Sequence, residues 1–176
     1  GCREAEAVAI KWVDIDFDKD EIEIKRQLIT SPKTVTKGTR WDTGKALSEE
    51  TLKTASNKNR PRKVPLPTRA KQILMAIPVA ERDEEKYITL NKNGEPMCPK
   101  NFSRRHHKRM MEKYGYDFKP HELRKWFGSY NISRGVPIAK VSRWMGHKNP
   151  KVTMESYLKE IEDMQDLVSY EADNIF

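Results

Sequence analysis

The chain of 176 residues has few of the features that mark secreted or membrane-bound proteins. Its two cysteines, Cys2 and Cys98, give neither a disulfide framework nor the spacing of a metal site. No apolar run approaches the length of a transmembrane helix, and no signal peptide opens the sequence. These absences argue against disulfide-stapled and membrane-spanning proteins, and we expect a cytoplasmic protein whose length suits one domain.

Patterns that bind metals are also missing. Aspartates alternate over residues 14–20 as in a calcium loop, but Lys19 replaces the glycine that such a loop needs and Lys25 replaces its closing glutamate. His106 and His107 are adjacent, so they do not lie one helical turn apart and cannot easily chelate a metal from one helix face. We therefore expect no bound metal and no cofactor.

Positive charge is in excess, with a formal net charge of +8. It is concentrated in two zones, which contain Lys53, Lys58, Arg60, Arg62, Lys63, Arg69 and Lys71, and Lys100, Arg104, Arg105, Lys108, Arg109 and Lys113. From Glu155 onward the sign reverses, because the acidic residues there face the single base Lys159. Two basic zones favour a polyanionic ligand, whereas the acidic end would be repelled by one.

Apolar spacing before residue 115 predicts short helices and strands separated by polar turns. Ile22, Ile24 and Leu28 share one parity, which is typical of a half-buried strand over residues 21–29. Residues 30–57 have few apolar anchors, so we expect a long irregular excursion there. The other expected elements are helices over residues 4–11, 68–77 and 99–114 and strands over residues 62–66 and 87–90. The inner edge of the 99–114 helix is expected to consist of Phe102, His106 and Met110.

A longer helix is predicted after residue 119. Pro120 can open it and Gly135 is a suitable end, because proline favours the first position of a helix and glycine the position after its last turn. The first turn places His121 and Arg124 on one face, since residues three apart are surface neighbours. The expected buried stripe of this helix consists of Leu123, Trp126, Phe127 and Tyr130.

Two shorter helices are predicted next. Pro137 opens the first, and Gly146 ends it and leaves His147 at its exit. Asn149 is the expected cap of the second, which carries Tyr157. An arginine, two imidazoles and a tyrosine thus occur within residues 121–157, on elements whose ends are well marked.

Two separated segments carry these motifs in order. The later one is HELRKWFGSYNISRGVPIAKVSRWMGHKNPKVTMESY, and the earlier one is GCREAEAVAIKWVDID at residues 1–16. Both resemble the catalytic boxes of the tyrosine recombinases, the phage integrase family. The resemblance implies an α+β fold that is mainly helical with a small antiparallel sheet. It implies a catalytic domain over residues 1–158, as an N-terminally truncated fragment, and an acidic docking segment over residues 159–176.

The resemblance also implies a catalytic set, which is Arg3, Lys53, His121, Arg124, His147 and Tyr157. The planar forks of Arg3 and Arg124 suit the non-bridging oxygens of a phosphate. Tyr157 would attack phosphorus, and the two histidines would handle its proton or bond to the phosphate. Such a set can cleave a phosphodiester without a divalent cation, because arginines replace the metal charge.

The general acid that protonates the leaving 5′ oxygen is expected to be Lys53, with Lys58 as the alternative. The alternative stays open because Lys53 lies farther from Pro65 than the family pattern suggests. Further contacts with the DNA backbone are expected from basic residues, namely Lys58, Arg60, Arg62, Lys63, Arg104 and Arg105.

The implied activity is site-specific cleavage and rejoining of double-stranded DNA through a covalent 3′-phosphotyrosyl intermediate, as in the integration or excision of a mobile element. The implied assembly is a homotetramer on paired sites at the bacterial nucleoid, with accessory DNA-bending proteins. The alternatives are a type IB topoisomerase that relaxes supercoils and a DNA-binding module of the same fold without catalysis. Ile161, Met164, Leu167 and Val168 predict an amphipathic helix in the acidic end, which packs either on its own domain or on a neighbouring protomer.

Overall fold

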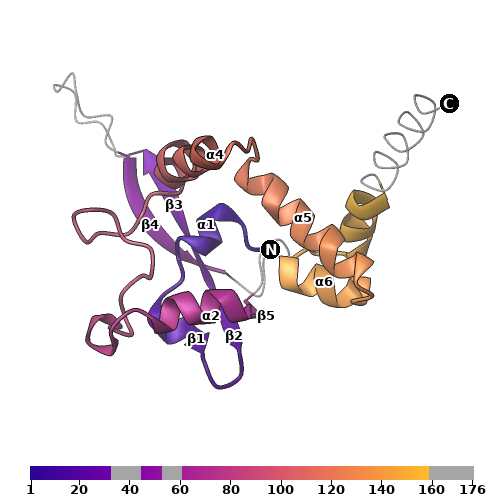
Figure 1. Ribbon diagram of the computed structural model, residues 1–176, viewed down its shortest axis with the longest axis horizontal. Coiled ribbons are helices and arrows are strands. Elements are labelled where there is room, and N and C mark those ends of the chain that lie inside the picture. The colour runs from indigo at the N-terminus through magenta and orange to yellow at the C-terminus, as the bar shows by residue number, and fades with distance from the viewer. Residues whose placement is uncertain (33–44, 53–60, 159–176) are drawn as a thin grey trace.

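The computed structural model describes residues 1–32, 45–52 and 61–158. These residues form an α+β fold that is mainly helical, which confirms the predicted fold class (Figure 1). The strands and the first helices lie on one side of the molecule, and α5 (Pro120–Ser133) and α6 (Ile138–Met145) lie on the other. The start of the chain lies between these two groups. In the described part of the chain, no helix is both long and apolar enough to cross a membrane.

The strands form two small antiparallel sheets. One has the order β1 (Ile15–Asp16), β2 (Glu21–Ile24) and β5 (Arg62–Pro65), and the other pairs β3 (Arg26–Pro32) with β4 (Lys45–Thr51). The strand predicted over residues 21–29 is therefore divided at Lys25, and the irregular excursion predicted over residues 30–57 is wrong for β4. The sequence of β4 has few apolar residues, so its backbone pairing with β3 defines it rather than an apolar pattern.

The helices before α5 are short. They are α1 (Glu4–Ala7), η1 (Trp12–Asp14), α2 (Thr68–Met75), η2 (Val79–Glu81), α3 (Pro99–Asn101), the π-helical turn η3 (Phe102–His107) and α4 (Lys108–Tyr114). The helix predicted over residues 4–11 ends early, whereas the one predicted over residues 99–114 is continuous through α3, η3 and α4. The strand predicted over residues 87–90 forms only isolated bridges, at Tyr87 and Leu90.

The π-helical turn corrects the predicted inner edge of this basic helix. A π turn has one more residue between hydrogen-bonded partners than an α turn, so it rotates the side chains that follow. His107 is consequently buried at 5% exposure, and His106, which was expected to face inward, is exposed.

The predicted ends of the C-terminal helices are confirmed. Pro120 is the first residue of α5, and Gly135 follows its end with a φ of 81°. Gly146 follows α6 with a φ of 69°. Asn149 Oδ1 accepts a hydrogen bond of 2.9 Å from the backbone N–H of Lys151, at the start of a helix that includes residues 150–158.

α5 buries a different face from the one predicted. Its buried residues are Arg124 and Gly128, and a Cβ built on Gly128 would lie 3.0 Å from the sulfur of Met145 on α6. The predicted apolar stripe is wrong for three residues, which are Leu123 at 43%, Trp126 at 61% and Tyr130 at 46% exposure. Close packing against α6 selects the face with the small residue, and the large aromatic side chains lie beside it.

One apolar cluster joins the two sides of the molecule. Buried Ile24, Leu52 and Val64 pack with half-buried Cys2 and Trp144. These residues belong to the sheets, the start of the chain and α6, so the cluster holds the chain start against both. A second buried cluster consists of Val8, Ala9, Leu28 and Met97.

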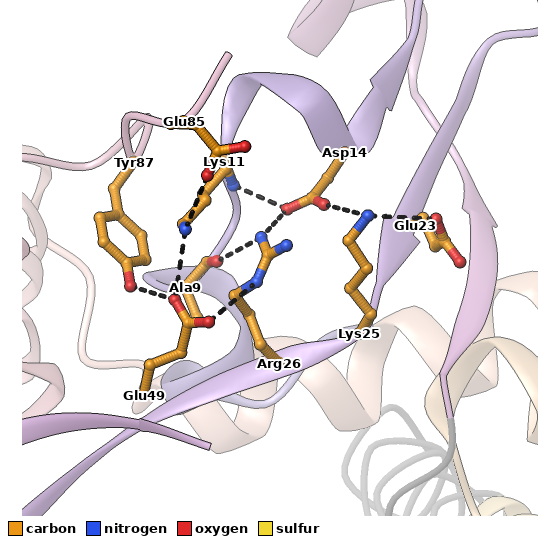
Figure 2. A network of polar contacts seen from close by, with 9 residues as sticks. All are labelled: Ala9, Lys11, Asp14, Glu23, Lys25, Arg26, Glu49, Glu85 and Tyr87. Atoms are coloured by element: carbon orange, nitrogen blue, oxygen red, sulfur yellow. Dashed lines mark hydrogen bonds and ion pairs between the residues drawn. The ribbon is translucent and has the colours of Figure 1, made fainter. Parts of the chain in front are cut away.

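A network of polar side chains fastens the β3–β4 pair to the turn before β1 (Figure 2). Arg26 donates to the buried carboxylate of Asp14, and its Nε lies 3.6 Å from Glu49. Lys25 Nζ lies 3.0 Å from the other oxygen of Asp14. The hydroxyl of Tyr87 donates to Glu49, and burial together with this bond raises the pKa of Tyr87 to about 12. We call these five residues and their partners Lys11, Glu23 and Glu85 the hairpin network.

Candidate active site

Arg124 connects three parts of the chain. It lies in the first turns of α5 at 5% exposure. Its Nη1 donates to the carbonyl of Gly1 and its Nη2 to the carbonyl of Met145, each at 2.6 Å. Burial and the nearby charge of Arg3 lower the pKa of Arg124 to about 10, so the guanidinium remains charged at neutral pH. A guanidinium has more donors than these two bonds use, which leaves it able to bind an anion as well.

Gly1 lies close against α5. A Cβ built on Gly1 would lie 2.4 Å from Cδ1 of the Phe127 ring, far inside van der Waals contact. Only a residue without a side chain therefore fits at this approach. The contact brings the segment that carries Arg3 next to the helix that carries Arg124.

Glu6 is a fully buried carboxylate that holds two arginines. It accepts hydrogen bonds from the backbone N–H of Arg3 at 2.8 Å and from Arg3 Nη1 at 3.0 Å. Arg62 binds the same carboxylate with two N–H groups, at 2.6 and 3.1 Å. Burial by itself would raise the pKa of Glu6, but the hydrogen bonds and charge of Arg62 hold that pKa below its ordinary value. Glu6 is thus an ionised anchor for both guanidinium groups.

Arg62 lies in β5, within the strand predicted over residues 62–66, but its side chain is buried. It was expected to contact DNA, but its side chain is 3% exposed because it is paired with Glu6. Its Nε donates to the carbonyl of Trp144 at 2.7 Å. A Cβ built on Gly146 would lie 2.8 Å from the guanidinium carbon of Arg62, so Gly146 is required both by its left-handed backbone and by this contact.

His147 lies directly after the end of α6. Its Nδ1 lies 2.7 Å from the hydroxyl of Thr153, which is 2% exposed. Burial and the positive charge of Arg124 lower the pKa of His147 to about 4. Arg3 and Arg62 act in the same direction. The imidazole is therefore neutral at physiological pH, and Thr153 fixes its orientation.

One small pocket of about 50 Å³ collects most of the predicted catalytic residues. His121, Arg124, His147 and Tyr157 all line it, together with Thr153, Ser156 and Met145. Arg3 is close enough for its charge to lower the pKa of both Arg124 and His147. The structure therefore brings four members of the predicted set into one pocket, from α5, the end of α6 and the helix of residues 150–158, and the charge of Arg3 at the chain start acts on two of them. Lys53 and its alternative Lys58 lie outside the described residues.

The pocket has an excess of positive charge. Among the described residues, Glu6 is the one carboxylate paired with Arg3 and Arg62, and its negative charge also acts on nearby Arg124. The causes that depress the pKa of His147 after burial are all positive or imidazole groups. Such an arrangement is stabilised by an anion in the pocket, and the arginine forks match the oxygens of a phosphate.

The other expected DNA contacts are distributed over the surface. Lys63 is exposed and forms an ion pair of 3.2 Å with Glu21 across β5 and β2. Arg104 and Arg105 are exposed on the π-helical turn. Arg105 lines a separate pocket with Arg109 and Lys92. Arg60, like Lys58, lies outside the described residues.

Sequence reasoning missed the parts played by Glu6, Arg62 and Thr153. Glu6 belongs to the first motif segment, but nothing in the sequence distinguishes a buried anchor from a charge on a helix surface. The positions of Glu6 and Arg62 become meaningful only when β5 lies beside α1. Among the described residues, no group of three or more His, Cys, Asp or Glu side chains could hold a metal ion.

The chain resembles known proteins in sequence and in fold. The chain is 29% identical over 171 residues to a protein of Caldanaerobacter subterraneus subsp. tengcongensis described as tyrosine recombinase XerC-like, covering 89% of this chain and 42% of that protein. A structure of the Tn1549 transposon integrase has a TM-score of 0.66 at 21% identity, over 88% of this chain and 49% of that one. The XerA recombinase has a TM-score of 0.58 at 16% identity, over 93% of this chain and 52% of that one.

This chain thus spans about half the length of the proteins it resembles. The sequence profile described as the phage integrase family matches residues 1–163, which include every motif segment and every described element of the site. The chain belongs to the phage integrase family.

Proposed function

We propose that this chain carries the DNA-cleaving centre of a site-specific tyrosine recombinase. The observation that supports this most directly is the pocket in which Tyr157 lies with Arg124, His121 and His147, beside the charge of Arg3. A nucleophile, phosphate-binding forks and proton carriers are the groups that cleavage of a phosphodiester needs. The pocket and the adjacent Arg3 offer a candidate for each of these groups, which supports the proposal.

In the proposed reaction, Tyr157 Oη forms a bond to the phosphorus, and the bond between phosphorus and the 5′ oxygen breaks. The phenol loses its proton to a histidine, and a lysine gives a proton to the departing 5′ oxygen. Arg3 and Arg124 hold the non-bridging oxygens, where charge increases in the transition state. The 3′-phosphotyrosyl bond conserves the energy of the original bond, so a 5′ hydroxyl can attack it and rejoin the strand.

The two histidines have different environments, which supports different roles. His147 has its pKa lowered to about 4 by burial and the charge of Arg124, so it is a weak base. With Nδ1 facing Thr153, its Nε2 can donate a hydrogen bond to a phosphate oxygen. His121 is exposed at the rim of the same pocket. We therefore assign His121 as the acceptor of the phenol proton.

Double-stranded DNA is the proposed partner. Structures of the Tn1549 transposon integrase are complexes with circular intermediate DNA and with transposon right end DNA. By that similarity we propose exchange of strands for integration or excision of a mobile element, by a homotetramer on paired sites, with accessory DNA-bending proteins at the bacterial nucleoid. Residues 1–158 would form the catalytic domain, and residues 159–176 the acidic docking segment.

The test is a nicked DNA substrate that traps the covalent intermediate, incubated with the chain and with the full-length protein that contains it. We expect a protein–DNA adduct that is resistant to denaturant, with the linked peptide containing Tyr157. If no adduct forms although DNA is bound, the protein is a binding module without catalysis. Relaxation of supercoiled DNA that lacks paired sites would favour a topoisomerase instead.

The general acid can be identified with a substrate whose bridging 5′ oxygen is sulfur, because a thiolate leaves without needing a proton. We expect Lys53→Ala to cleave this substrate although it does not cleave the ordinary one. Lys58→Ala should show no such rescue. The opposite pattern would assign the role to Lys58.

The acidic segment is tested by deleting residues 160–176. Docking on a neighbouring protomer predicts that the shortened chain binds one DNA site normally but assembles poorly on paired sites. If the deletion instead abolishes the cooperative thermal transition of the monomer, the segment belongs to the core of its own domain.

A further inference from the structure

We propose that Arg62 is a positioning residue for the cleavage reaction, holding Arg3 in place through Glu6 and His147 in place through the end of α6. Arg62 itself does not touch the substrate. The proposal rests on the function proposed above, and it goes beyond that function because it assigns a role to a residue outside the catalytic set.

The first link runs from β5 to the chain start. Both Nη groups of Arg62 bind Glu6, at 2.6 and 3.1 Å, so the carboxylate is held in one plane. The same two oxygens of Glu6 receive Arg3 Nη1 at 3.0 Å and the Arg3 backbone N–H at 2.8 Å. The direction of the Arg3 guanidinium is therefore set by a carboxylate that Arg62 orients.

The second link runs from β5 to α6. Arg62 Nε donates to the carbonyl of Trp144 at 2.7 Å, and Arg124 binds the next carbonyl, that of Met145, at 2.6 Å. Two arginines thus satisfy consecutive carbonyls at the C-terminal end of α6, where intrahelical partners are missing. The chain then turns at Gly146 against the Arg62 guanidinium and continues to His147.

Charge and burial explain why an arginine occupies this place. The side chain of Arg62 is 3% exposed and that of Glu6 is 0% exposed, so neither is available to solvent or to DNA. A planar guanidinium can bind a carboxylate in a bidentate manner and still donate through Nε in a third direction, which a lysine ammonium cannot do in the same geometry. By contrast, Arg3 is 35% exposed and its charge acts on the pocket. Arg62 therefore holds Arg3 in position, and Arg3 is the residue that faces the ligand.

The test variant is Arg62→Lys, which keeps the charge and removes the fork. The matched control is Arg82→Lys, because Arg82 also donates to helix-end carbonyls, those of Ile77 at 2.8 Å and Met75 at 2.7 Å, away from the pocket. We expect Arg62→Lys to lower the rate of cleavage by about 100-fold, as for a small displacement of a reacting group. DNA affinity should stay within about 3-fold of the unmodified protein, and Arg82→Lys should cleave at the normal rate.

A double-mutant cycle separates positioning from general damage to the fold. If Arg62 acts through Arg3, the loss in Arg3→Lys with Arg62→Lys should be far smaller than the product of the two single losses, because one group being positioned is already lost and only the link to His147 remains. Independent losses would multiply to roughly 10⁴-fold. A multiplied loss, or a loss of DNA affinity equal to the loss of rate, would overturn the proposal.

Two further measurements keep the outcome decisive. If Arg62→Lys lacks a cooperative thermal transition, the variant is not folded. Glu6→Gln, which weakens the same link, then takes the place of Arg62→Lys in the double-mutant cycle. If the unmodified protein forms no covalent adduct, the proposed function fails, and positioning is then read from the NMR resonance of the Arg3 Nε–H group. That resonance should shift or broaden in Arg62→Lys and stay unchanged in Arg82→Lys. An unchanged resonance in both variants would overturn the link between Arg62 and Arg3.

Discussion

Two regions of this molecule are built from buried arginine–carboxylate pairs, yet their charge balance differs. In the hairpin network the cations Lys11, Lys25 and Arg26 face at least as many carboxylates, those of Asp14, Glu23, Glu49 and Glu85 (Figure 2). In the pocket region the single carboxylate of Glu6 is shared by Arg3 and Arg62, with Arg124 nearby. Counting only the described part of the chain, carboxylates balance the cations of the hairpin network, whereas the pocket region has unbalanced positive charge.

The difference indicates what each region is for. A balanced buried network holds strands in register, and removing one partner leaves a buried charge without compensation. An unbalanced cluster is tolerated at a cost in the free protein and is relieved when an anion binds. The pKa of His147 is lowered first by burial and then by the charge of Arg124, so the excess positive charge adds to the effect of burial. Variants in the two regions should therefore affect different measurements.

The largest contrast is expected between two tyrosines. Tyr157→Phe should abolish the covalent adduct with DNA and leave the thermal midpoint nearly unchanged, because it removes only the nucleophilic oxygen. Tyr87→Phe should form the adduct normally but lose about 1 kcal/mol of stability, since Glu49 loses a hydrogen bond. Denaturing gels and urea titrations measure the two effects. An adduct formed by Tyr157→Phe would show that another residue is the nucleophile.

The next contrast is between arginines. Arg3→Lys should reduce cleavage at least about 100-fold with little change in DNA affinity, as for the loss of one preorganised donor. Arg26→Lys should lose about 1–3 kcal/mol of stability and keep the normal cleavage rate below its melting temperature. Arg124→Lys should show both losses, because Arg124 also holds the carbonyls of Gly1 and Met145. If Arg3→Lys lost DNA affinity and cleavage rate equally, Arg3 would only anchor the DNA backbone.

The two regions should also respond to opposite ends of the pH scale. Burial and Arg124 lower the pKa of His147 from 6.5 to about 4, so its contribution to stability is present above about 6.5 and is lost as the pH falls toward 4. The pKa of Tyr87 is raised from 10.0 to about 12, so its contribution is present below 10 and is lost as the pH rises toward 12. Urea titrations should show that His147→Gln flattens the acid limb only and Tyr87→Phe the alkaline limb only. A change in the alkaline limb for His147→Gln, or in the acid limb for Tyr87→Phe, would contradict the environments described for these two residues.

The smallest expected effect is stabilisation by a simple anion. Sulfate or pyrophosphate should raise the thermal midpoint by roughly 2–4 °C, because an anion that binds only the folded pocket stabilises it by mass action. Arg26→Lys should keep this shift, because the hairpin network has no excess positive charge that would bind the anion. Arg3→Lys should reduce it. A shift that is equal in both variants would place the anion somewhere other than the pocket.

Local chemistry in the sequence was sufficient to predict the helix ends around the site. Proline at a first position, glycine after a last turn and asparagine as a cap act within a few residues, so the ends of α5 and α6 and the start of the helix of residues 150–158 follow from short-range rules. The order of the motifs, and the family resemblance that this order carries, can also be read from the sequence alone. Spacing within α5 predicted that His121 and Arg124 would share a face, and both line the pocket.

Tertiary structure alone decided which charged and aromatic residues are buried. Sequence spacing predicts an apolar face, but it does not say which neighbour the helix meets, so Trp126 is exposed while Arg124 is buried. Arg62 belongs to a basic zone in the sequence, and only the placement of β5 beside α1 and α6 gives it Glu6 as a partner. The physical reason is that a buried charge depends on partners far away in the chain, whereas a helix end depends on residues next to it.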